Sequence, residues 1–130
     1  MINKKDSERT VYFNGNYIPE SQAKVPFRDR SFKYGDGVFE MTRTFGHKIF
    51  KIKEHVDRLY ESLNYMDIHI NLSKKEMIDI SNKILEINLP LINNKEDYWV
   101  GQRISRGIDK VGGEQWDIDG GPTIIVECAP

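Results

Sequence analysis

The chain has 130 residues, which is the length of one ordinary domain. Its composition, 38% hydrophobic and 30% charged residues, is typical of a globular protein and excludes a disordered one. The net charge is -1 and the lysines and arginines are scattered among the acids, which excludes the basic stripe of a nucleic-acid-binding protein.

Cysteine content and hydropathy exclude further kinds of site and of protein. The single cysteine, Cys128, excludes an intramolecular disulfide framework and a cysteine-based metal site. The first residues lack the apolar run of a signal peptide, and no window reaches the length of a membrane span. We therefore expect a cytoplasmic protein that binds no metal, no membrane and no nucleic acid.

The N-terminal third begins with polar residues and one clear hairpin. Residues 1–9 are polar and are expected to form a flexible arm. Asn14-Gly15 suits the positive φ angles of a type I′ turn, so Val11–Pro19 is predicted to be a β-hairpin. Ser21–Lys33 contains a proline and has no sustained period, which predicts a loop.

A glycine-rich strand entrance follows this loop. Two glycines in Gly35–Gly37 indicate either a tight turn or a backbone that passes close to a ligand. Tyr34, just before them, either offers its hydroxyl to a bound anion or packs in the core. In the strand that comes next, the period-2 alternation places on one face Phe39, Met41, Arg43 and Phe45.

Two helices are predicted next. Apolar residues recur at the helical period over Lys53–Asp67. Ser73–Glu76 has the pattern of a capping box, in which the serine and glutamate side chains satisfy first-turn N–H groups. A second apolar stripe follows it and is ended by Pro90.

The C-terminal third is predicted to be two strands. Asp97–Ser105 and Pro122–Cys128 have strand character, and the glycine-rich Ile108–Gly121 between them is turn-like. Hairpins, two helices and then two strands indicate an α+β fold with a small antiparallel or mixed sheet. Because the chain stops directly after a strand of core character, we expect that further residues follow it in a longer protein.

Four arginines are candidates for binding phosphate or carboxylate groups, because arginine offers planar paired donors and stays charged. Arg58 on the first helix either has such a role or forms an exposed ion pair with Glu54. Arg103 and Arg106 differ by three positions along a strand-like run and should face opposite ways. Arg43 is either buried and paired or lines a pocket.

Three segments together resemble a known family. Tyr34–Glu40, Phe50–Leu59 and Ser105–Gly107 are similar, in this order, to the class IV (fold-type IV) aminotransferases. That family includes branched-chain aminotransferase, D-amino-acid aminotransferase and aminodeoxychorismate lyase. The resemblance implies that 10–130 is the small N-terminal domain of a transferase with pyridoxal 5'-phosphate as cofactor. It also implies amino acid and 2-oxo acid substrates and a homodimer.

The resemblance also implies roles for individual residues. Arg58 matches the arginine that binds the cofactor phosphate, and the resemblance therefore favours this role over an ion pair with Glu54. Arg106 matches the arginine that helps to hold the substrate carboxylate in the D-amino-acid branch. The positions that match the lining of the substrate pocket are Tyr34, Phe39, Met41 and Arg43.

Several family features have no match in these residues. None of the lysines matches the Schiff-base lysine, so we expect no catalytic residue here and no activity from the 130-residue chain alone. The family places that lysine in a C-terminal cofactor-binding domain, which this chain does not contain. Met41 stands where the branched-chain branch has glycine, and the residues after Arg106-Gly107 lack the histidine of the D-amino-acid branch. The substrate therefore stays open.

Three functions are compatible with the sequence. The first is amino transfer by a longer enzyme, and the second is a lyase reaction in the same family. The third is a free-standing, non-catalytic domain that binds small anions or a protein partner. If a covering domain belongs on the Phe39, Met41 and Arg43 face, that face is exposed in this chain and should promote self-association.

Overall fold

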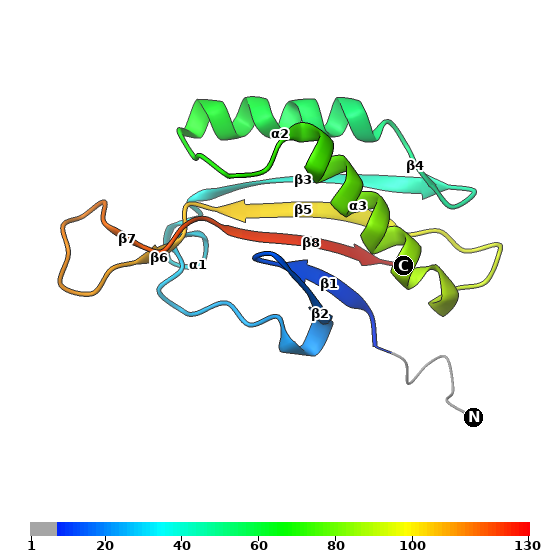
Figure 1. The fold of residues 1–130 in the computed structure, drawn as a ribbon, viewed down its shortest axis with the longest axis horizontal. Coiled ribbons are helices and arrows are strands. Elements are labelled where there is room, and N and C mark those ends of the chain that lie inside the picture. Colours follow the sequence, from blue (N-terminus) through cyan, green and yellow to red (C-terminus); the bar gives the residue numbers. More distant parts are fainter. Residues whose placement is uncertain (1–7) are drawn as a thin grey trace.

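The computed structural model describes residues 8–130, which form a β-sheet with two helices packed on one face (Figure 1). The sheet has six strands in the order β2-β1-β8-β5-β3-β4, and every pairing is antiparallel. Its strands are β1 (Thr10–Phe13), β2 (Asn16–Pro19), β3 (Gly37–Phe45), β4 (Lys48–Ile49), β5 (Trp99–Ser105) and β8 (Thr123–Ala129). The predicted antiparallel sheet of hairpins is confirmed.

Two long helices cover the sheet. They are α2 (Ile52–Met66) and α3 (Lys74–Asn88), close to the two predicted helices. The smaller elements are helix α1 (Arg30–Tyr34), short 3₁₀ turns at Glu20–Gln22 and Leu89–Leu91, and a two-stranded hairpin of β6 (Ile108–Asp109) and β7 (Ile118–Asp119). None of the helices described over residues 8–130 is both long enough and apolar enough to cross a membrane.

The core lies between the helices and the sheet. The apolar stripe of α2 that was read from the sequence is the stripe that is buried, and Leu59 at its centre is fully enclosed. Burying one such side chain contributes about 1.5–3 kcal/mol. Its neighbours in the same core include Val56, Leu63, Met77, Ile84, Val100, Ile104 and Val126.

Local turn signals are confirmed in detail. Asn14 and Gly15 have φ angles of 46° and 97°, as the type I′ turn requires. Asn14 Oδ1 accepts a 2.7 Å hydrogen bond from the N–H of Ile124, which ties the hairpin to β8. At the start of α3, Ser73 Oγ accepts from the N–H of Glu76 at 3.1 Å, and the Glu76 carboxylate accepts in return from the N–H of Ser73.

Two segments expected to be loop or turn contain regular structure. Ser21–Lys33 includes the start of α1, and Ile108–Gly121 includes the β6–β7 hairpin. Helix α1 is a little more than one turn long, so it is too short for an apolar period to appear in the sequence. Of the predicted arm, residues 1–7 lie outside the described part of the chain. Arg9 is paired with Glu20 at 3.0 Å.

The sheet face opposite the helices carries exposed aromatic side chains. The alternation predicted for β3 is confirmed, because Glu40, Thr42 and Thr44 are buried on the other face, the one toward the helices. Phe39 is 64% exposed, and Trp99 on β5 is 43% exposed. We call the surface formed by alternate residues of β3, β5 and β8, namely Phe39, Met41, Arg43, Trp99, Gly101, Arg103, Ile125 and Glu127, the open face.

Candidate functional site

A buried carboxylate organises the approach to the open face. Asp29 caps the N-terminus of α1, and its Oδ1 accepts from Ser31 N at 2.9 Å and Ser31 Oγ at 2.7 Å. Its Oδ2 accepts from Ser105 Oγ at 2.9 Å and from Thr123 Oγ1 at 2.6 Å. Burial raises the pKa of Asp29, but the four hydrogen bonds outweigh it, so the pKa lies below its usual value. The carboxylate thus joins α1 to β5 and β8.

A second carboxylate joins two arginines. Asp36 Oδ2 accepts from Arg30 Nε and from Arg106 Nε, both at 2.8 Å. Burial raises the pKa of the Asp36 carboxyl, and the two guanidinium groups together lower it below its usual value. Asp36 is the middle residue of the glycine-rich strand entrance, so this ion pair fixes the turn through which β3 begins.

Arg106 also caps the end of α2. Its Nη1 donates to the carbonyl of Asp67 at 3.1 Å and its Nη2 to the carbonyl of Met66 at 2.8 Å. A cation at the C-terminal end of a helix is favoured by the helix dipole. All three guanidinium nitrogens of Arg106 therefore have protein partners, which leaves one further N–H group on each of Nη1 and Nη2.

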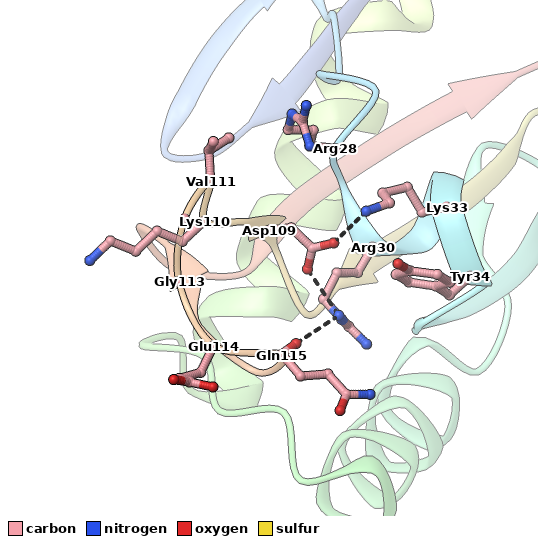
Figure 2. A pocket seen from close by; sticks show the side chains of 11 residues that line it. Arg28, Arg30, Lys33, Tyr34, Asp109, Lys110, Val111, Gly113, Glu114 and Gln115 are labelled. Atoms are coloured by element: carbon pink, nitrogen blue, oxygen red, sulfur yellow. Dashed lines mark hydrogen bonds and ion pairs between the residues drawn. The ribbon is translucent and has the colours of Figure 1, made fainter.

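Arg30 and Tyr34 line a hollow beside the 110–115 loop. Figure 2 shows Asp109 accepting from Arg30 and from Lys33, at 2.9 Å and 2.8 Å. The Arg30 guanidinium also stacks between the rings of Tyr34 and Trp116, at 4.9 Å and 5.0 Å from their centroids. The hollow has a volume of about 420 Å³. Tyr34 is one of its walls and is largely exposed.

A second hollow lies on the open face. It has a volume of about 440 Å³, is mainly apolar, and includes Phe39, Arg103 and Ile125 in its lining. The Arg103 guanidinium lies 5.6 Å from the Phe39 ring centroid and 3.4 Å from Glu127 Oε1. Because Arg106 is turned toward α2, the prediction that Arg103 and Arg106 face different ways is confirmed.

Met41 and Arg43 lie further along the same face. A Cβ atom added to Gly101 on β5 would come within 2.7 Å of the Met41 Cε, so the methionine lies across this glycine. The guanidinium of Arg43 is 5.5 Å from the ring centroid of Trp99. Arg43 is exposed and has no ion pair among residues 8–130, which decides against the buried alternative.

Arg58 pairs with a buried glutamate on β3. Its Nε donates to Glu40 Oε2 at 2.6 Å and its Nη2 to Glu40 Oε1 at 2.7 Å. His55 Nδ1 lies 3.0 Å from Glu40 Oε1. The ion pair considered with Glu54 is therefore wrong, because α2 packs over β3 and brings Glu40 closer to the guanidinium. The Arg58 guanidinium lowers the pKa of the Glu40 carboxyl, burial opposes this, and His55 adds to the lowering.

Comparison with known proteins shows which proteins this chain is similar to. It matches no family model. It is 38% identical over 120 residues to a Methanocaldococcus jannaschii protein described as "Putative branched-chain-amino-acid aminotransferase", covering 92% of this chain and 40% of that one. It is 35% identical over 78 residues to D-alanine aminotransferase of Staphylococcus aureus, covering 60% of this chain and 28% of that enzyme. The chain is a relative of the class IV aminotransferases.

Solved structures agree on the fold of this aminotransferase relative. The branched-chain aminotransferase of the archaeon Thermoproteus uzoniensis, solved with norvaline, superimposes on this chain with a TM-score of 0.73. That superposition covers 95% of this chain and 41% of that one, at 20% identity. At such an identity the likeness shows the fold alone, and it confirms the α+β architecture.

A second solved structure carries a cofactor derivative. It is a branched-chain amino acid aminotransferase complexed with N-(5'-phosphopyridoxyl)-L-glutamate, and it superimposes with a TM-score of 0.76. The superposition covers 92% of this chain and 40% of that one, again at 20% identity. The chain also spans 40% or less of the length of the two curated relatives named above.

In this aminotransferase relative, the residues proposed for the site fall into separate groups. Phe39, Met41 and Arg43 share the open face, whereas Tyr34 lines the hollow beside the 110–115 loop. Arg58 lies on the helix side of β3 and contacts none of them by a hydrogen bond or ion pair. Sequence reasoning missed Glu40, although a charged residue on the buried face of a strand was already visible in the β3 alternation.

Proposed function

We propose that residues 10–130 are the small domain of a pyridoxal phosphate-dependent aminotransferase. The enzyme would move an amino group between an amino acid and a 2-oxo acid as a cytoplasmic homodimer. A second domain, outside these 130 residues, would supply the lysine that holds the cofactor. The names of the relatives support this, as does the phosphopyridoxyl-glutamate adduct in one of the solved branched-chain enzymes.

The observation that carries the proposal is the free edge of Arg58. Glu40 occupies the Nε and Nη2 positions, and Nη1 has no hydrogen-bond partner among residues 8–130. The side chain is 64% exposed, so this edge is accessible. A guanidinium edge matches the spacing of two phosphate oxygens and fits the phosphate of the cofactor. The chemistry that pyridoxal phosphate supplies when bound is an electron sink at the amino-bearing carbon.

The open face would provide one wall of the substrate pocket. Phe39 and Met41 would contact the substrate side chain, and Met41, lying across Gly101, would leave less depth than a glycine at its position. Arg43 points from this wall and is available to a carboxylate, whereas Arg103 already contacts Glu127 at 3.4 Å. Arg106 is already held by Asp36 and by the end of α2, so it would reach a carboxylate through the second N–H group of Nη1 or Nη2.

Tyr34 lies apart from the open face. Its ring packs beside Arg30 and lines the hollow next to the 110–115 loop rather than the open-face hollow. The family resemblance implies that residues of the partner subunit complete each site of a homodimer, and we propose that Tyr34 is one of them. Tyr34→Phe should then raise KM without changing the cofactor affinity of the enzyme.

The experiment that tests the proposal uses the full-length protein and pyridoxal phosphate. Binding should produce the absorbance band of the lysine-linked cofactor, and Arg58→Ala should weaken cofactor affinity by about 10- to 100-fold, because a charge-assisted paired contact is lost. Unchanged affinity in Arg58→Ala would reject the assignment. Pyruvate release without an amino acceptor would point to the lyase reaction instead.

A further inference from the structure

Glu40 has no obvious part in amino transfer, yet it is among the most strongly bonded carboxylates of the chain. Its side chain is 7% exposed, and both of its oxygens accept from Arg58, at 2.6 Å and 2.7 Å. We propose that Glu40 is a positioning residue, which fixes the Arg58 guanidinium so that its free edge faces the cofactor phosphate. This inference rests on the proposed role of Arg58.

His55 is a second contact of the Glu40 carboxylate. Its Nδ1 lies 3.0 Å from Glu40 Oε1, and a carboxylate can only accept, so the contact requires the proton on Nδ1. His55 and Arg58 both belong to α2, one helical turn apart, and Glu40 belongs to β3 beneath them. The carboxylate therefore cannot rotate without breaking a contact, and the orientation of Arg58 is set by the packing of α2 on β3.

A fixed guanidinium matters because Arg58 is otherwise an exposed, long side chain. Arginine loses much rotamer freedom when it is immobilised, and a ligand that has to immobilise it binds less tightly. Here two of the nitrogens are already held, and the remaining edge is presented in one orientation. The arginine is thus ordered before the phosphate arrives.

The charge of Glu40 makes the inference testable. A carboxylate close to the phosphate repels it, so simple electrostatics predicts that removing the negative charge strengthens phosphate binding. The positioning role of Glu40 predicts the opposite result, in which removal of the carboxylate weakens phosphate binding. In Glu40→Gln one amide oxygen can still accept, but the amide N–H group faces a guanidinium donor, so the paired contact is lost.

The test compares affinities of the full-length protein for pyridoxal phosphate and for pyridoxal, which lacks the phosphate. Glu40→Gln should weaken pyridoxal phosphate binding by about tenfold and leave pyridoxal binding unchanged. In an Arg58→Ala background, Glu40→Gln should have no further effect, because a positioning residue acts only through the group that it positions. Thr42→Val is the matched control, since it removes a buried 2.7 Å bond to Phe50 O from the same strand face without contacting Arg58.

The outcomes separate the inference from the proposed function. If Arg58→Ala weakens binding and Glu40→Gln leaves it unchanged or strengthens it, the positioning role is overturned and the role of Arg58 stands. If Arg58→Ala has no effect on the affinity for pyridoxal phosphate, the phosphate-binding role of Arg58 and the positioning role of Glu40 are both wrong. If Glu40→Gln does not fold, Glu40→Asp decides, because aspartate keeps the negative charge but is one methylene too short to make the paired contact with Arg58. Binding as tight as in the unsubstituted protein would overturn the positioning role, and a loss similar to that of Arg58→Ala would support it.

Discussion

Substituting Asp29 should destabilise the domain more than any exposed acid does. Asp29 is fully buried and accepts four hydrogen bonds that join α1 to two strands of the sheet. Asp29→Ala removes an N-cap acceptor, which alone costs about 0.5–2 kcal/mol. It also leaves the hydroxyls of Ser105 and Thr123 without their acceptor in a buried site. Together these losses amount to about 3–5 kcal/mol of the free energy of unfolding.

Urea unfolding of the 130-residue chain measures this effect. With a slope of about 2 kcal/mol per molar, the midpoint of Asp29→Ala should fall by roughly 2 M. Asp79→Ala is the control, because Asp79 is exposed and, within residues 8–130, pairs only with Lys75 one turn earlier in α3. Such a pair contributes less than about 0.5 kcal/mol. A midpoint for Asp29→Ala equal to that of Asp79→Ala would refute the reasoning.

The pH dependence gives a second check on Asp29. The folded-state pKa of this carboxyl lies below its usual value, so the ionised form is the one that the fold stabilises. That contribution is fully present above the unfolded pKa of about 3.9 and is lost as the pH falls through the folded pKa. The stability difference between the unsubstituted chain and Asp29→Asn should therefore be constant near neutral pH and shrink below about pH 4. A stability difference between the two proteins that grows as the pH falls would contradict this prediction.

Two further predictions concern the open face and the core. The 130-residue chain should self-associate through the open face, because the rings of Phe39 and Trp99 are 64% and 43% exposed. The double substitution Phe39→Ser with Trp99→Ser should reduce the association measured by light scattering. A clean monomer of the unsubstituted chain at high concentration would count against this prediction. Burial raises the pKa of the Cys128 thiol to about 12, so alkylation at pH 8 should be slow in the folded chain and fast in urea. Equal alkylation rates in the two conditions would show that Cys128 is accessible.

Sequence reasoning succeeded where the physical cause is local. The Asn14-Gly15 turn and the Ser73–Glu76 capping box were predicted because their hydrogen bonds and φ angles involve residues within a few positions. The same holds for β3, where alternation placed Phe39 and Arg43 on one face, although the structure was needed to show that the other face, with Glu40, is the buried one. A resemblance carried by short motifs then identified the family before any contact was known.

The polar contacts of the candidate site were decided by the tertiary structure. Arg58 has a carboxylate at i−4 in its own helix, but its partner is Glu40, eighteen positions away, because α2 packs on β3. Asp29 reaches Thr123 across ninety-four positions, and Arg106 reaches the end of α2 across forty. Periodicity indicates which apolar residues of a helix are buried, whereas the partner of a buried charge depends on which elements pack together. That choice is made by the whole sheet, so only the folded chain reveals it.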